Sequence, residues 1–103
     1  MKELTSENFD KEVLMTPGIV LIDFFATWCG PCKSMVPLLE QLDSSRQDLT
    51  VFKVDIDKSQ DLAQRFKVSS VPTFKFIKSG RVLKTQVGMM NPNDLDNILN
   101  SLT

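Results

Sequence analysis

Cys29 and Cys32 are the only cysteines of this 103-residue chain, and only Gly30 and Pro31 separate them. Thiols at this spacing can close to a small disulfide and reopen, which transfers two electrons in each cycle. The same pair can instead bind zinc or act as a structural crosslink. Which of these three roles the pair has determines the function of the protein.

Zinc binding and crosslinking both fit the sequence poorly. A disulfide that closes a loop of about four residues removes only about 2 kcal/mol of unfolded-state entropy, against about 3 kcal/mol for a 15-residue loop. A structural zinc ion needs four ligands, and the chain offers two cysteines and no histidine, so only a site shared by two copies would complete the set. These arguments favour redox chemistry.

The composition is that of an ordinary globular domain spanning residues 1–103, with 42% hydrophobic and 24% charged residues. Twelve basic and thirteen acidic residues nearly balance, and no Lys/Arg cluster marks a phosphate-binding face, so we expect no nucleic acid partner. Residues 1–7 lack the apolar stretch of a secretory signal, and no apolar segment is long enough to span a bilayer. We therefore expect a cytoplasmic location without membrane attachment, where a close cysteine pair is more often catalytic or metal-binding than structural.

The cysteine pair lies between a predicted strand and a predicted helix. Apart from Asp23, residues Ile19 to Ala26 are apolar without alternation, which is typical of a strand buried on both faces. After Cys32, apolar residues at i, i+3, i+4 and i+7 predict a packed helix with a kink at Pro37. These residues are Met35, Leu38, Leu39 and Leu42.

The remaining elements complete an α/β fold. They are a helix from Ser6 to Met15 capped by Thr5, a strand from Thr50 to Ile56, a helix capped by Ser59, a hairpin of Thr73–Ile77 and Val82–Val87 with Gly80 at positive φ, and a helix that Asn91 caps and Pro92 opens. With a further strand before the first helix, the predicted order is β-α-β-α-β-α-β-β-α. It indicates a mixed sheet covered by helices on both faces.

The junction predicts different roles for the two cysteines. A helix N-terminus offers unpaired N–H groups and about half a positive charge, which stabilises a thiolate. We expect Cys29 to be the more exposed and to have the lower pKa, whereas Cys32 lies about one turn inside the helix. Cys29 then attacks a disulfide, and Cys32 attacks the resulting mixed disulfide to release the product.

Several nearby residues allow two interpretations each. Asp23 is either a buried acid of raised pKa that takes the proton of Cys32, or a strand-edge residue bonded to backbone amides, which the pattern alone favours. Lys53 either pairs with Asp23 or is an exposed lysine, again the reading that the pattern favours. Frequency alone predicts a trans bond before Pro72. Trp28 is a substrate platform or an aromatic cap, and Met89 offers adaptable contacts or fills the core.

The sequence resembles the thioredoxin family almost from end to end. The matching segments are Asp23-Phe24-Phe25-Ala26-Thr27-Trp28-Cys29-Gly30-Pro31-Cys32-Lys33, Pro37, Lys53-Val54-Asp55-Ile56-Asp57, Val71-Pro72-Thr73-Phe74, Gly80 and Val87-Gly88. The resemblance implies the thioredoxin fold, with a central mixed five-stranded sheet flanked by four helices. It also implies a thiol–disulfide oxidoreductase.

Residue by residue, the resemblance implies that Cys29 is the nucleophile, Cys32 the resolving thiol, Asp23 the acid/base partner and Lys53 its charged neighbour. It implies a cis bond at Pro72, against the frequency argument. The implied docking surface for substrates consists of Trp28, Gly30, Pro31, Val71, Pro72, Gly88 and Met89. Phe25, where many members have a second tryptophan, and Met89, where a smaller residue is common, depart from the family pattern.

The implied function is a monomeric, cytosolic protein-disulfide reductase that binds no metal or cofactor of its own. Its implied partners are disulfide-containing proteins and a flavin- and NADPH-dependent thioredoxin reductase. Two alternatives stay open: an isomerase or oxidase of exported proteins, and a binding module whose thiols are incidental. The missing signal and the Gly30-Pro31 pair disfavour the first of these.

Overall fold

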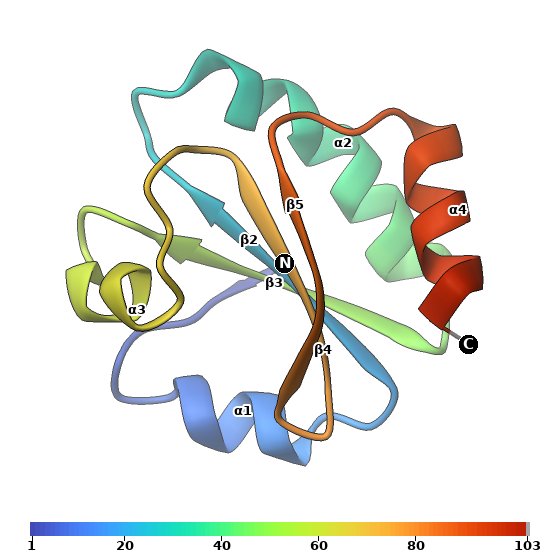
Figure 1. Ribbon diagram of the computed structural model, residues 1–103, viewed down its shortest axis with the longest axis horizontal. Helices are drawn as coiled ribbons and strands as arrows, with labels where there is room; N and C mark the ends of the chain where they lie inside the picture. Colours follow the sequence, from blue (N-terminus) through green and yellow to red (C-terminus); the bar gives the residue numbers. More distant parts are fainter. Residues whose placement is uncertain (103) are drawn as a thin grey trace.

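The computed structural model describes residues 1–102, which form five strands and four helices in the order predicted from the sequence (Figure 1). The elements are β1 (Lys2–Glu3), α1 (Phe9–Met15), β2 (Ile19–Phe25), α2 (Gly30–Ser45), β3 (Leu49–Asp55), α3 (Gln60–Arg65), β4 (Thr73–Lys78), β5 (Arg81–Val87) and α4 (Pro92–Leu102). The predicted fold class is confirmed.

The five strands form one mixed sheet in the order β1-β3-β2-β4-β5. The pairs β1–β3 and β3–β2 are parallel, whereas β2–β4 and β4–β5 are antiparallel. The continuous apolar run of β2 has its physical reason here, because a central strand covered on both faces needs apolar side chains in both directions. Every residue of β2 from Ile19 to Phe24 is buried.

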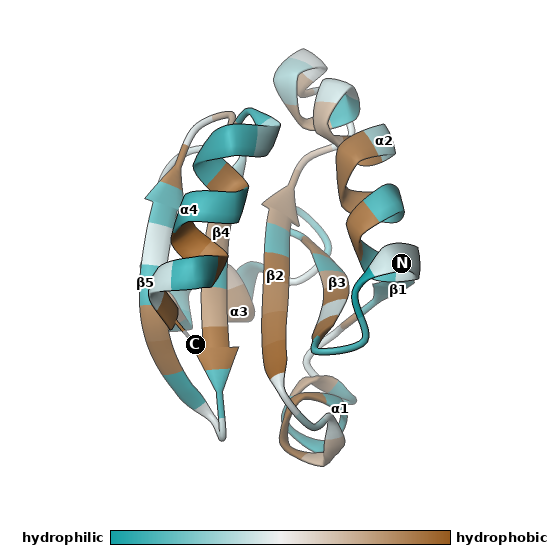
Figure 2. Cartoon of the chain, turned by 90° about the vertical axis from the view of Figure 1, so that its right-hand side faces the viewer, coloured by the Kyte–Doolittle hydropathy of each residue, from teal (hydrophilic) through white to brown (hydrophobic). Residues whose placement is uncertain are grey.

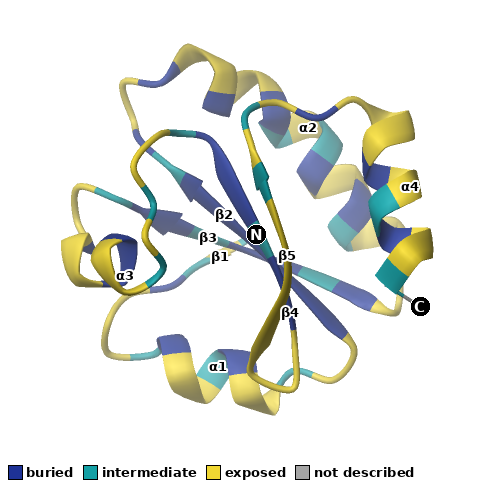
Figure 3. Ribbon diagram, in the orientation of Figure 1, coloured by how far each residue is buried: buried dark blue, intermediate teal, exposed yellow. Residues whose placement is uncertain are grey.

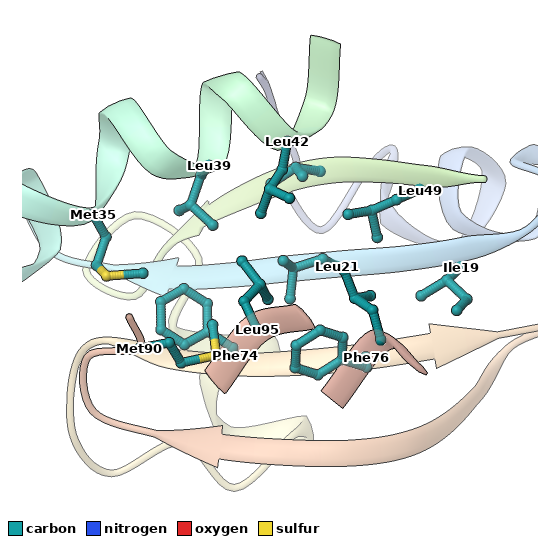
Figure 4. Packing of buried hydrophobic residues seen from close by; sticks show 12 residues of the cluster. Ile19, Leu21, Met35, Leu39, Leu42, Leu49, Phe74, Phe76, Met90 and Leu95 are labelled. Carbon is teal, nitrogen blue, oxygen red and sulfur yellow. The ribbon is translucent and has the colours of Figure 1, made fainter. Parts of the chain in front are cut away.

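Two hydrophobic clusters fix the helices to opposite faces of the sheet. On one face, α2 and α4 pack onto the inward side chains of β2, β3 and β4, as Figure 4 shows for Leu39, Leu95 and Phe74. On the other face, α1 and α3 contribute Phe9 and Leu62 to a second cluster. The helices therefore hold β2 rigidly between two layers.

The last helix follows its predicted cap. The side chain of Asn91 accepts a hydrogen bond from the N–H of Asp94 at 2.8 Å, and the carboxylate of Asp94 accepts one from the N–H of Asn91 at 3.2 Å. This reciprocal arrangement satisfies donors that a helix start leaves unpaired. Figure 2 shows the hydrophobic side of α4 turned toward the sheet and its hydrophilic side turned outward.

One sequence-based expectation about this fold is wrong. The first helix begins at Phe9 rather than Ser6, because Asn8 accepts the N–H of Thr5 at 2.7 Å and so closes a turn before the helix. The expected helices on both faces of the sheet are confirmed, although every residue of the edge strand β5 is exposed or only half-buried. The helix α2 runs through Pro37, and the kink there stays a prediction.

The core position Leu39 provides a test of this packing. Leu39 is fully buried between α2 and the sheet, so Leu39→Ala should lower the free energy of unfolding by about 2–5 kcal/mol. The matched control is Leu14→Ala in α1, where the side chain is 66% exposed and the change should stay within about 0.5 kcal/mol. Urea unfolding measures both values, and equal losses would contradict the described core.

Candidate redox site

The two cysteines lie where β2 has ended and α2 begins. Cys29 is the N-cap of α2, and a disulfide joins it to Cys32 with the two Cα atoms 5.3 Å apart. The N–H of Cys32 donates a hydrogen bond to Sγ of Cys29 at 3.1 Å. Pro31 fits the first turn of α2 because the N–H groups there have no partner within the helix.

The disulfide is packed into a small apolar cluster. Ala26 is buried beside it, and Phe25, Ile56 and Val71 pack against the same cluster. Cys29 is 4% exposed and Cys32 is 3% exposed, so the expected difference in exposure is not found in this disulfide form. The helix turn alone does not set the exposure of the two cysteines, because residues from three separate segments pack against them.

Asp23 is a buried acid in the central strand. It is 2% exposed, and within residues 1–102 its Oδ1 has no hydrogen-bond partner. Burial raises the pKa of Asp23 from 3.8 to about 7, and the positive charge of Lys53 opposes that rise. The strand-edge interpretation is therefore wrong, because β3 and β4 occupy both edges of β2 around this residue.

Lys53 lies directly beside Asp23 in the parallel register of β2 and β3. The lysine is half-buried, and its Nζ lies 5.6 Å from the centre of the Phe25 ring, an arrangement that favours a cation over an aromatic face. None of the ion pairs formed by residues 1–102 joins Lys53 to Asp23. Its attraction to the carboxylate therefore acts beyond direct contact distance.

The loop that precedes β4 reaches the disulfide. The Val71–Pro72 bond is cis, as the resemblance implied and against the frequency argument. Val71 packs against the disulfide cluster, and the N–H of Gly88 donates to the carbonyl oxygen of Pro72 at 2.8 Å. This bond ties Gly88 to the loop, and the next residue, Met89, is 53% exposed.

Trp28 is held over the surface by a residue that the sequence analysis did not single out. The indole N–H donates to Oδ2 of Asp57 at 2.9 Å, while Trp28 stays 68% exposed. The carboxylate of Asp55 accepts the N–H groups of Asp57 and Lys58 at 2.9 and 3.2 Å, which shapes the turn after β3. The only signal for Asp57 was its place in the matched segment.

The structure brings most of the predicted docking residues to the surface. Trp28, Gly30, Pro31 and Met89 are exposed, Val71 and Gly88 are half-buried, and Pro72 is buried.

Comparison with known proteins decides the family. The family model described as thioredoxin matches residues 1–101. The chain belongs to the thioredoxin family. It is 39% identical to the thioredoxin of Chlamydia pneumoniae over 100 residues, which cover 97% of this chain and 96% of that protein. It is 40% identical to the thioredoxin of Bacillus subtilis over 97 residues, covering 93% and 91%.

As a member of the thioredoxin family with this cysteine pair, the chain is a thiol–disulfide oxidoreductase that works by dithiol–disulfide exchange. Within residues 1–102, no group of three or more His, Cys, Asp or Glu side chains is arranged to hold a metal ion. No helix in this described part is long and apolar enough to cross a membrane.

The buried acid predicts a pH-dependent stability. Between about pH 4 and pH 7 the folded chain keeps the proton of Asp23 that the unfolded chain has lost, so this group destabilises the fold increasingly as the pH rises. Asp23→Asn should therefore raise the free energy of unfolding more at pH 8 than at pH 4, by on the order of 3 kcal/mol. Urea unfolding of the oxidised protein at both pH values measures this difference. Glu40→Gln, at an exposed position, is the control, and equal gains at both pH values would contradict the raised pKa.

The bond between Trp28 and Asp57 predicts a change in fluorescence. Trp28 is the only tryptophan, so its emission reports on this position alone. Asp57→Ala should lower the steady-state anisotropy of Trp28, because the indole loses the carboxylate that holds it. The control is Asp61→Ala, which removes a nearby exposed carboxylate bonded to Ser6 instead. Unchanged anisotropy in Asp57→Ala would show that the bond does not fix the ring.

Proposed function

We propose that this protein reduces disulfide bonds of other proteins, with Cys29 as the attacking thiol and Cys32 as the resolving thiol. The observation that carries this proposal is the N-cap position of Cys29, whose Sγ accepts the N–H of Cys32 at 3.1 Å. A helix N-terminus favours negative charge at that sulfur, and the thiolate is the nucleophile in disulfide exchange. Cys32 lies within the first turn, where it can reach Sγ of Cys29.

The exchange proceeds in two steps. The Cys29 thiolate attacks one sulfur of the substrate disulfide, a mixed disulfide forms, and the other substrate sulfur leaves as a thiolate. The Cys32 thiol then loses its proton and attacks Sγ of Cys29, which releases the second substrate thiolate. The substrate gains two electrons, and the protein ends as the Cys29–Cys32 disulfide that the structure contains.

Asp23 is the group that we propose takes the proton of Cys32 in the second step. It lies on the sheet face that α2 covers, because side chains two residues apart share a face and Leu21 and Ile19 pack against α2. Its pKa of about 7 lets it both accept and return a proton near neutral pH. Lys53 keeps this pKa from rising further, so the acid remains partly ionised at neutral pH.

The proposed docking surface surrounds the disulfide and consists of Trp28, Gly30, Pro31, Val71, Pro72, Gly88 and Met89. Its support is the exposure of Trp28 and Met89 together with the packing of Val71 against the disulfide cluster. Exposed apolar side chains beside a redox pair favour contact with the partly apolar chain around a substrate disulfide.

A thioredoxin reductase that draws on NADPH is the proposed source of electrons, because the chain holds only one redox pair and must be re-reduced after each cycle. We further propose a monomer that acts in the cytoplasm and needs no cofactor of its own. The whole-length match to bacterial thioredoxins supports these assignments.

A trapping experiment tests the assigned roles. Cys32→Ser should accumulate mixed disulfides between Cys29 and substrate proteins, because the second step is blocked while the first remains. Cys29→Ser is the matched control and should accumulate none. Both variants should abolish NADPH-dependent reduction of insulin in the presence of a thioredoxin reductase. Trapping by Cys29→Ser instead would reverse the roles.

A redox titration against glutathione separates reduction from oxidation. A reductase should have a potential well below the value of about −120 mV that marks a strong disulfide-forming oxidant. A potential near that value would contradict the proposed direction of the reaction.

A further inference from the structure

Strand β5 is an open edge of the sheet along its whole length. The sheet ends at β1 on one side and β5 on the other, and β1 has only two residues whereas β5 has seven. Figure 3 shows β5 almost entirely exposed next to the buried β4. An edge strand of this kind presents unpaired N–H and C=O groups that can bind another extended chain.

The charge of this edge is of one sign. Residues 62–93 contain six Lys or Arg and no Asp or Glu. Lys78, Arg81 and Lys84 are exposed on the β4–β5 hairpin and take part in none of the ion pairs within residues 1–102. The sequence shows no adjacent basic run, and it is the hairpin that brings these charges together.

The acidic residues of the neighbouring helix do not neutralise the hairpin. Helix α1 lies against the hairpin turn, where a Cβ placed on Gly80 would be 3.1 Å from Leu14. Of its two acidic residues, Asp10 pairs with Arg65 at 2.9 Å and Glu12 pairs with Lys2. Neither carboxylate is therefore paired with Lys78, Arg81 or Lys84.

A register shift opposite Phe76 and Ile77 leaves Leu83 without a partner on β4, so Arg81 and Lys84 share one face of β5 and Val82 and Val87 share the other. Val82 is 44% exposed, Leu83 is 41% exposed and Val87 is 61% exposed, so β5 offers apolar side chains to a chain that binds along it. The edge also runs directly into Gly88, so it is continuous with the proposed docking surface. A chain bound along β5 would pass close to that surface without covering the disulfide.

A second copy of the chain would bring a second set of positive charges to this edge. In an antiparallel pair of β5 strands centred on Lys84, the two copies of Lys84 lie opposite each other, and like charges in that position are destabilising. An acidic strand meets the opposite situation, because its carboxylates lie across from Arg81 and Lys84 while its apolar side chains meet Val82 and Val87.

We propose that the free edge of β5 binds an extended, acidic segment of a partner protein, which adds a sixth strand to the sheet. Backbone hydrogen bonds give this binding its direction, and Arg81 and Lys84 select the charge of the segment. The binding needs neither thiol, so it is independent of the proposed reductase activity.

A synthetic peptide tests this inference on the intact protein. The probe is a capped heptapeptide of alternating Glu and Val, titrated into the oxidised protein and followed by backbone NMR and amide hydrogen exchange. The expected result is saturable binding with added protection of β5 amides. The same peptide N-methylated at alternate residues should bind at least about tenfold more weakly, because it keeps the charge and loses the backbone donors.

Charge reversal gives the second arm. The double variant Arg81→Glu/Lys84→Glu should weaken binding at least about tenfold, whereas Lys33→Glu/Lys58→Glu, with the same net charge at exposed sites in α2 and in the turn after β3, should change it little. Absence of saturable binding, or equal affinity of the N-methylated peptide, would overturn the inference. Protection of β5 that rises with protein concentration alone would assign the edge to a second copy, and binding only to vesicles of anionic phospholipid would assign it to a membrane surface. Either result would also overturn it.

Discussion

Strand β2 pairs with β3 on one side and β4 on the other, and apolar clusters cover both of its faces. A strand enclosed in this way can be placed in only one register, because a shift of one residue would exchange the two clusters. The end of β2 is therefore fixed, and with it the start of α2 and the position of Cys29. The geometry of the disulfide follows from packing several residues away.

The same enclosure explains why the acid of the site, Asp23, weakens the fold. A carboxyl group in the middle of β2 has no water and no full set of polar partners, so burial dominates its behaviour. A leucine at this position would suit the cluster better. Stability alone therefore does not account for a carboxyl group at this position, whereas a buried acid of raised pKa suits the proton transfer that we propose for it.

Most of the fold could be predicted from the sequence, because strong apolar patterns and caps such as Asn91 act locally. The start of α1 was missed because Thr5 and Asn8 are both good caps, and only the folded turn decides between them. The state of Asp23 depends on which strands flank β2, which the local pattern does not contain. The partnership of Trp28 with Asp57 likewise joins two segments that are distant along the chain.

The disulfide between the only two cysteines has a consequence beyond catalysis. With a single possible pairing within the chain, oxidation yields one covalent form, and no isomeric crosslinks can compete with it. Each molecule therefore exists as either a dithiol or a closed disulfide, and intermediate forms require a second molecule. At equilibrium, the ratio of dithiol to disulfide molecules therefore reports the reduction potential of the surroundings.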